Sequence, residues 1–208
     1  GYKFGGAPRC CSWWSPWGLV GYRFGGLRVR RAEHSAVPSA PRADRSPAPP
    51  VLEPDPEHAG WMAIALDEAR AATLHGDVPI GAVVVQLPDG DAPRVLTRRH
   101  NERELSHDGT AHAEVLALRD ACAELGRWRL DDCLMVVTLE PCPMCAGALW
   151  ATRIGGVVIG TESMDAGALG SLYHLGQDPR LNHEFPVRVG VERGACAAIL
   201  QDFFAARR

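Results

Sequence analysis

Apolar residues along this chain change their spacing several times, and each spacing predicts a secondary-structure element. From residue 57 they recur at helical intervals, and Gly76 marks the end of that helix. The apolar members of the helix are Trp61, Ile64, Ala65, Ala69 and Ala72. A β-rich run then covers residues 80–85, a turn covers residues 88–91, and a return strand covers residues 94–97. The folded part of the chain is therefore expected to open with a helix and a β-hairpin.

The rest of the chain alternates between helical and strand patterns. After a loop that ends near residue 110, a helix begins at His112 and a buried strand covers residues 134–138. A second helix runs from Cys142 to about residue 152, and it is followed by strands at 155–160 and 186–191 and a closing helix at 194–208. A hairpin followed by such units predicts an α/β fold, with a mixed sheet and helices on both faces. The starts of the two inner helices then share one edge of the sheet, where α/β folds bind ligands.

Residues 1–56 show neither the helical nor the strand spacing of apolar residues. They are rich in Gly, Pro, Ser and Arg, and they carry eight basic and four acidic residues. The sequence G-Y-K-F-G-G at 1–6 recurs as G-Y-R-F-G-G at 21–26, but two copies are too few for a repeat fold. We expect a disordered N-terminal extension over residues 1–56 and one folded domain over residues 57–208. The alternative for the extension is a basic, aromatic arm that binds RNA.

Composition and charge narrow the class of protein. Of the 208 residues, 46% are hydrophobic and 23% are charged, which is typical of a globular protein, and no stretch is apolar enough to span a membrane. No secretory signal is visible, and an odd count of seven cysteines favours a reducing compartment, so we expect a cytoplasmic protein. Residues 57–208 carry 14 basic and 21 acidic residues, a net charge of −7. This net charge argues against a broad basic face for nucleic acid, so any such contact must rest on a local patch.

Two short fragments carry the chemistry. The first is T-A-H-A-E, which contains His112 and Glu114, and the second is T-L-E-P-C-P-M-C, which contains Cys142 and Cys145. Together they form the pattern H-x-E with P-C-x-x-C, the known signature of zinc-dependent nucleobase deaminases. A catalytic zinc ion takes three nitrogen or sulfur ligands from the protein and leaves its fourth position to water. His112, Cys142 and Cys145 supply those three ligands.

The spacing of these residues suits their roles. Two cysteines three residues apart in the first turn of a helix can face one ion, and the helix N-terminus favours their thiolate form. Glu114, two residues after His112, can reach the water molecule and carry its proton to the leaving amine. A C-x-x-C pair can instead be a redox pair or half of a structural zinc site. Proline on both sides of Cys142 and the lack of a second C-x-x-C argue against these alternatives.

Residues 57–208 resemble the bacterial family of tRNA-specific adenosine deaminases. The resemblance extends beyond the zinc signature to residues 77–82, Asn101, 107–114, 138–147, 152–154, 167–171, 182–183 and 202–208. It implies the cytidine-deaminase-like fold, a three-layer α/β/α sandwich with a mixed five-stranded sheet. It also implies a homodimer with one Zn²⁺ per subunit. The implied substrate is the tRNA anticodon stem-loop, whose wobble adenosine becomes inosine.

The resemblance also implies residues that bind the substrate. Asn101 would form a hydrogen bond with the purine, and a buried amide in that role discriminates strongly between bases. Phe203, Phe204 and Arg207 would line the groove for the anticodon loop, by stacking and by contact with phosphate. The alternatives are an asparagine that serves only a turn and phenylalanines of an ordinary amphipathic helix.

One position departs from the family pattern. Where the family carries a lysine before the glycines near residue 167, this chain has Asp165. A reversed charge there would repel RNA phosphate, and together with the acidic domain it favours a second hypothesis. In that hypothesis the same zinc site deaminates a free base or nucleoside of the guanine or cytosine type. A non-catalytic RNA-binding relative is a third possibility, which the presence of Glu114 argues against.

Overall fold

The computed structural model describes residues 52–207, so nearly all of the expected N-terminal extension lies outside the described residues. The described helices are α1 (Glu57–Ala72), α2 (Arg103–Ser106), α3 (Ala113–Leu125), α4 (Pro143–Ala151) and α5 (Arg193–Ala205). The strands are β1 (Gly81–Gln86), β2 (Arg94–His100), β3 (Cys133–Leu139), β4 (Gly156–Thr161) and β5 (Val187–Val189). Two short 3₁₀ helices, η1 (Thr73–His75) and η2 (Leu175–Gln177), complete this part of the chain.

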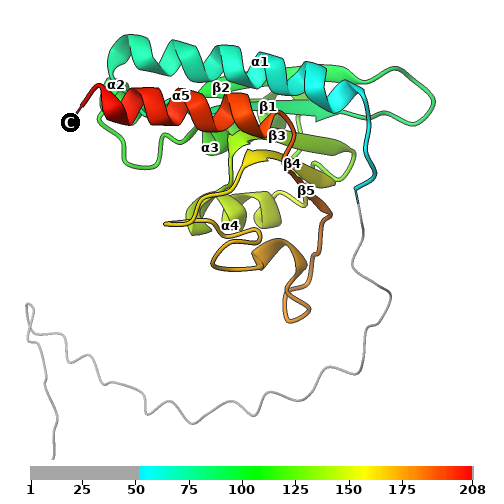
Figure 1. The fold of residues 1–208 in the computed structure, drawn as a ribbon. Helices are drawn as coiled ribbons and strands as arrows, with labels where there is room; N and C mark the ends of the chain where they lie inside the picture. The colour runs from blue at the N-terminus through cyan, green and yellow to red at the C-terminus, as the bar shows by residue number, and fades with distance from the viewer. Residues whose placement is uncertain (1–51, 208) are drawn as a thin grey trace, which may run out of the picture. The chain divides into compact units, whose positions relative to one another are not determined.

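The five strands form one mixed sheet in the order β2-β1-β3-β4-β5. β1 runs antiparallel to both β2 and β3, whereas β3, β4 and β5 run parallel to one another. α1 and α5 lie side by side on one face of the sheet, and α3 and α4 cover the other face (Figure 1). The predicted α/β fold, with a hairpin first and helices on both faces, is confirmed.

The alternation of side chains along β1 separates two apolar cores. Ala82 and Val84 face α3 and α4, and Val83 and Val85 face α1 and α5. Every one of these four side chains is fully buried. A strand buried on both faces reads as a continuous apolar run, which is why the sequence at residues 80–85 showed no alternation.

The predicted elements differ from the observed ones mainly at their ends. The return strand extends to His100, and the expected loop up to residue 110 contains the one-turn helix α2. The predicted last strand at 186–191 shortens to Val187–Val189, since Gly190 adopts a φ of 96°. Gly76 ends the first helical segment with a φ of 86°, as predicted.

The cysteines at positions 122, 133, 142, 145 and 196 form no disulfide among the described residues. In that same part of the chain, every helix is too short or too polar to cross a membrane. Leu52 packs against the core beneath α1, so the packed region begins a few residues before the helix.

Candidate active site and metal centre

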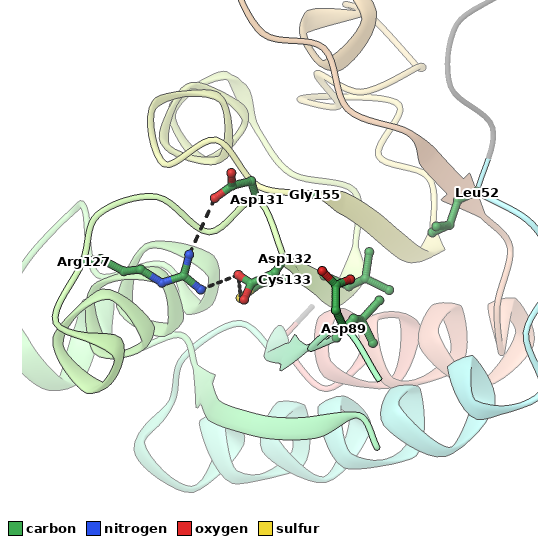
Figure 2. Close-up of a pocket in the computed structure, with 9 residues that line it drawn as sticks. Leu52, Asp89, Arg127, Asp131, Asp132, Cys133 and Gly155 are labelled. Atoms are coloured by element: carbon green, nitrogen blue, oxygen red, sulfur yellow. Dashed lines mark hydrogen bonds and ion pairs between the residues drawn. The ribbon is translucent and has the colours of Figure 1, made fainter. Parts of the chain in front are cut away.

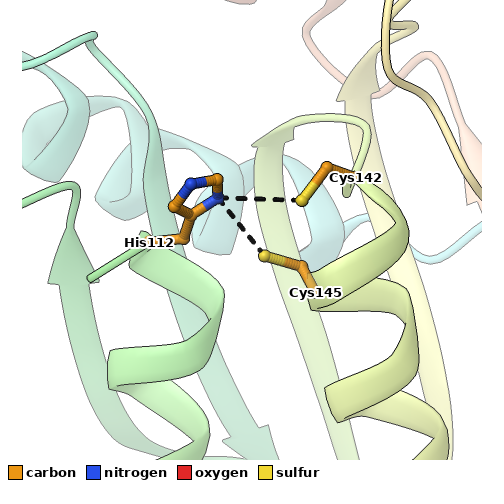
Figure 3. Close-up of side chains that lie close together, drawn as sticks. All are labelled: His112, Cys142 and Cys145. Carbon is orange, nitrogen blue, oxygen red and sulfur yellow. Dashed lines mark hydrogen bonds between the residues drawn. The ribbon is translucent and has the colours of Figure 1, made fainter. Parts of the chain in front are cut away.

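The three predicted metal ligands meet at the starts of two helices. His112 is the N-cap residue of α3 and Cys142 is the N-cap residue of α4, both in extended backbone conformation. Pro143 occupies the first turn of α4, where its missing N–H leaves no intrahelical bond unmade. Cys145 follows within that turn, and its side chain points toward His112 together with that of Cys142 (Figure 3). The buried strand β3 delivers both cysteines to this point.

The distances within this group fit a zinc ion. His112 Nδ1 lies 3.8 Å from Cys142 Sγ and 3.5 Å from Cys145 Sγ. Tetrahedral zinc with Zn–S bonds of about 2.3 Å and Zn–N bonds of about 2.0 Å requires a sulfur–nitrogen separation of about 3.6 Å. All three ligand atoms lie within 4.8 Å of one another, and no other group of three or more such residues in the described part of the chain does so. The residues present therefore fit a metal site with three protein ligands.

The charges within the group also favour a cation. The hydrogen bond with Cys145 lowers the pKa of the Cys142 thiol to about 3, with a further contribution from His112. The same hydrogen bond, together with burial, raises the pKa of Cys145. The thiolate is the form that ligates metals. The Cys142 thiol therefore favours the form that a metal ion requires, and Cys145 would lose its proton on binding one.

Glu114 lies in the first turn of α3, next to the metal group. Its side chain is only 3% exposed, and burial raises the pKa of its carboxyl group. Its Oε2 atom is buried and has no hydrogen-bond partner among the described residues. Buried carboxylate oxygens are rarely left without a partner, so this atom is expected to face a bound ligand. A raised pKa also suits a group that must both accept and give a proton near neutral pH.

Asn101 follows β2 and is buried beside the start of α3. Its Oδ1 accepts a hydrogen bond of 2.9 Å from the backbone N–H of Ala113, the residue after His112. No hydrogen bond of its Nδ2 group is found in the described part of the chain. The side chain therefore serves the start of α3 with its oxygen and keeps its amide donors available. A purine contact by these donors remains a prediction.

Phe203, Phe204 and Arg207 come together at the end of α5. The guanidinium group of Arg207 stacks on the Phe203 ring at 3.6 Å and donates a 2.8 Å hydrogen bond to the carbonyl of Gly76. The two phenylalanine rings meet edge to face, and Phe204 is 49% exposed. These three residues line a shallow groove with His75, Gly76, Val78 and Glu104. Because Glu104 belongs to α2, the groove reaches the segment that joins Asn101 to His112.

Two buried carboxylates hold the segments beside the metal group, and the sequence assigned neither a role. Asp77 accepts hydrogen bonds from the backbone N–H groups of Glu104 and Leu105 and pairs with His75. Burial alone would raise the pKa of Asp77, but these hydrogen bonds outweigh it and lower the pKa. Glu140 binds the backbone between β4 and β5 in the same way. Both lie inside segments of the family resemblance, which was the only signal for them.

A different pocket lies at the far end of β3 from the metal group. It has a volume of about 520 Å³ and is lined by Asp131, Asp132 and Cys133 at the start of the strand, with Leu52 and Arg127 nearby (Figure 2). Arg127 pairs with both Asp131 and Asp132, and Asp89 also lines the pocket, so its lining is acidic. Cys133 donates a hydrogen bond to Asp132, but burial raises the pKa of this thiol to about 12, so it is not a ready nucleophile and we place the chemistry at the metal group.

Known proteins resemble this chain over most of its described residues. Residues 56–208 match the family described as MafB19-like deaminase. The tRNA-specific adenosine deaminase of Bacillus subtilis (strain 168) is 43% identical over 144 residues, which are 69% of this chain and 86% of that relative. The protein of the same description from Haemophilus influenzae is 39% identical over 147 residues, 71% of this chain and 83% of the relative.

Solved structures share the fold. One comes from studies of A-to-I editing by tRNA:A34 deaminases at the wobble position of transfer RNA. It is 40% identical, with a TM-score of 0.63, and the match covers 68% of this chain and 99% of that one. The guanine deaminase from Nitrosomonas europaea is 28% identical, with a TM-score of 0.59, over 76% of this chain and 88% of that one.

A mixed sheet between two helical layers, with a His-Cys-Cys group able to bind a metal ion beside a buried glutamate, defines a deaminase. The match to relatives at 39–43% identity covers 83–86% of the length of each relative. The chain belongs to the family of tRNA-specific adenosine deaminases, as the resemblance predicted.

Proposed function

We propose that this protein hydrolyses the wobble adenosine of a tRNA anticodon to inosine and releases ammonia. The observation that carries the proposal is the buried, unpartnered Oε2 atom of Glu114 beside the group formed by His112, Cys142 and Cys145. Those three residues would hold one Zn²⁺ per subunit. Bound there, zinc would supply Lewis-acid activation of the hydrolytic water.

The residues of the chain supply the rest of the chemistry. Glu114 takes the proton from the attacking water and passes it to the amino group on C6 of the adenine ring, which leaves as ammonia. The available Nδ2 group of Asn101 donates a hydrogen bond to an acceptor on the base, and its orientation is fixed by the bond between Oδ1 and Ala113. Water and adenosine are consumed in equal amounts, so no further reactant is needed.

Features remote from the metal group support tRNA as the substrate. The groove at the end of α5 offers an exposed phenylalanine, Phe204, for stacking and the cation of Arg207 for phosphate. The relatives at 39–43% identity are named as tRNA-specific adenosine deaminases. We further propose that the protein works as a homodimer, as the family resemblance implies, and in the cytoplasm, as its odd count of seven cysteines favours.

Incubation of the full chain with an unmodified tRNA transcript that carries adenosine at the wobble position tests the proposal. Inosine should form at that position, and a transcript with guanosine there should remain unchanged. Parallel reactions with free guanine, adenine and cytosine, scored for ammonia, test the alternative of a free-base deaminase. Rapid ammonia release from a free base without inosine in tRNA would replace the proposed function by that alternative.

A further inference from the structure

Glu140 is a buried carboxylate whose hydrogen bonds all go to one segment of the chain. It is 5% exposed and lies two residues before Cys142. Its Oε1 accepts hydrogen bonds from the backbone N–H groups of Leu169 and Ser171, at 2.9 and 3.0 Å. Its Oε2 accepts one from the backbone N–H of Ser163, at 3.1 Å, and one from the Ser171 hydroxyl group. Four donors thus converge on two oxygens.

The segment that donates these bonds, residues 163–171, also packs directly on the turn that carries the metal ligand. The backbone N–H of Ala168 donates a 2.9 Å hydrogen bond to the carbonyl of Pro141, the residue before Cys142. At Gly167 a Cβ atom would overlap the carboxylate of Glu140 and lie 2.6 Å from the Ser163 carbonyl. Glycine is therefore required here by close approach, and the segment is in contact with Glu140 along its length.

Backbone N–H groups and the Ser171 hydroxyl group compensate the charge of Glu140. Among the ion pairs in residues 52–207, none involves this side chain. A buried carboxylate that loses donors is costly, and hydrogen bonds to a charged group are individually stronger than neutral ones. Release of residues 163–171 would break several hydrogen bonds to Glu140 at once. The buried carboxylate would then have no donor to compensate its charge. The segment is thus held in one conformation as a unit, before any substrate arrives.

We propose that Glu140 is a positioning residue for this reaction: it fixes residues 163–171 beside the metal ligand so that the substrate-binding surface is formed in advance. The inference rests on the proposed function, because it takes the tRNA as the ligand that needs this surface. When only a fraction of molecules has the competent conformation, the apparent affinity falls by that fraction. Loosening the segment should therefore raise KM more than it lowers kcat.

The test is Glu140→Gln in the full chain. The new amide nitrogen should occupy the position of Oε2, where the Ser171 hydroxyl group can turn to accept its hydrogen bond. At the position of Oε1 it would instead face two backbone N–H donors, from Leu169 and Ser171, and could bond to neither. The bond from Ser163 is then lost and those from Leu169 and Ser171 are kept. Amide hydrogen exchange should speed up first at Ser163. KM for the tRNA transcript should rise roughly tenfold, with kcat changed less than about threefold and zinc content unchanged.

Two further variants sharpen the result. Ser171→Ala removes only the hydroxyl donor, keeps the fold and should raise KM by about threefold. Asp77→Asn makes the same carboxylate-to-amide change at the other buried carboxylate. It should speed exchange at Glu104 and Leu105 and leave residues 163–171 unaltered.

Three outcomes would overturn the proposal. One is an unchanged exchange rate at Ser163 in Glu140→Gln. Another is loss of zinc in proportion to activity, which would mean that Glu140 only supports the cysteine ligand. The third is a fall in kcat at constant KM, which a smaller folded fraction would produce. Exchange and zinc content do not depend on the substrate, so they test Glu140 even if the wild-type protein fails to deaminate tRNA.

Discussion

Replacement of Glu114 by glutamine should separate catalysis from folding. The amide has nearly the volume of the carboxyl group, but it cannot carry a proton between water and the leaving amine. Loss of a general acid–base group reduces rates by about 10²–10⁴-fold, which corresponds to roughly 3–5 kcal/mol in the activation free energy. Burial raises the pKa of Glu114, so the folded protein disfavours its ionised form. At neutral pH the neutral amide should therefore be no less stable than the wild type.

Single-turnover inosine formation, zinc content and the melting temperature measure these effects together. Glu124→Gln is the matched control, because it makes the same change on an exposed part of the same helix, α3. We expect wild-type zinc content for both variants, a normal rate for the control, and at least a hundredfold loss for Glu114→Gln. A rate within tenfold of the wild type at full zinc content would refute the role of Glu114 as the proton carrier.

Three other predictions concern substitutions outside the metal group. In Gly81→Ala a Cβ would lie 2.7 Å or less from backbone atoms of α1, so we expect a loss of about 3 kcal/mol and roughly 10 °C in Tm by thermal unfolding. Gly60→Ala, in open space on α1, should instead raise stability by about 0.5–1 kcal/mol. Asp165→Lys, at an exposed site, should tighten tRNA binding about fivefold at low salt and less at high salt, and equal affinities at low salt would contradict it. The lowered pKa of Asp77 adds stability that is present above about pH 4 and lost as the pH falls, so Asp77→Asn should approach wild-type stability in acid.

The sequence predicted the metal group well because its information is local. His112 and Cys142 cap helices whose apolar spacing was visible, and each helix start was placed within one residue. The strand that delivers the cysteines was equally clear, since β3 is apolar throughout and buried. Once those elements pack as an α/β sandwich, the ligands have to meet at one edge of the sheet.

The segments around the metal group were not predicted, because contacts between distant residues determine them. The one-turn helix α2 has too few residues to show a periodicity, and it is held by Asp77, about 27 positions earlier in the chain. The segment after β4 is likewise held by Glu140, 23 to 31 positions earlier. Nothing in the spacing of either acid shows that a later segment will fold back onto it.

This division between local and distant information suggests how substrate choice can differ among proteins that share this fold. The guanine deaminase from Nitrosomonas europaea shares the fold at 28% identity. The same sheet and helix starts can therefore support the deamination of different bases. Segments held by a few buried carboxylates can change in shape without disturbing β3 or the ligands that follow it. Residues 102–107, held by Asp77, and residues 163–171, held by Glu140, are such segments here. Substrate choice should therefore follow exchanges of these segments, whereas exchanges within the sheet should change stability alone.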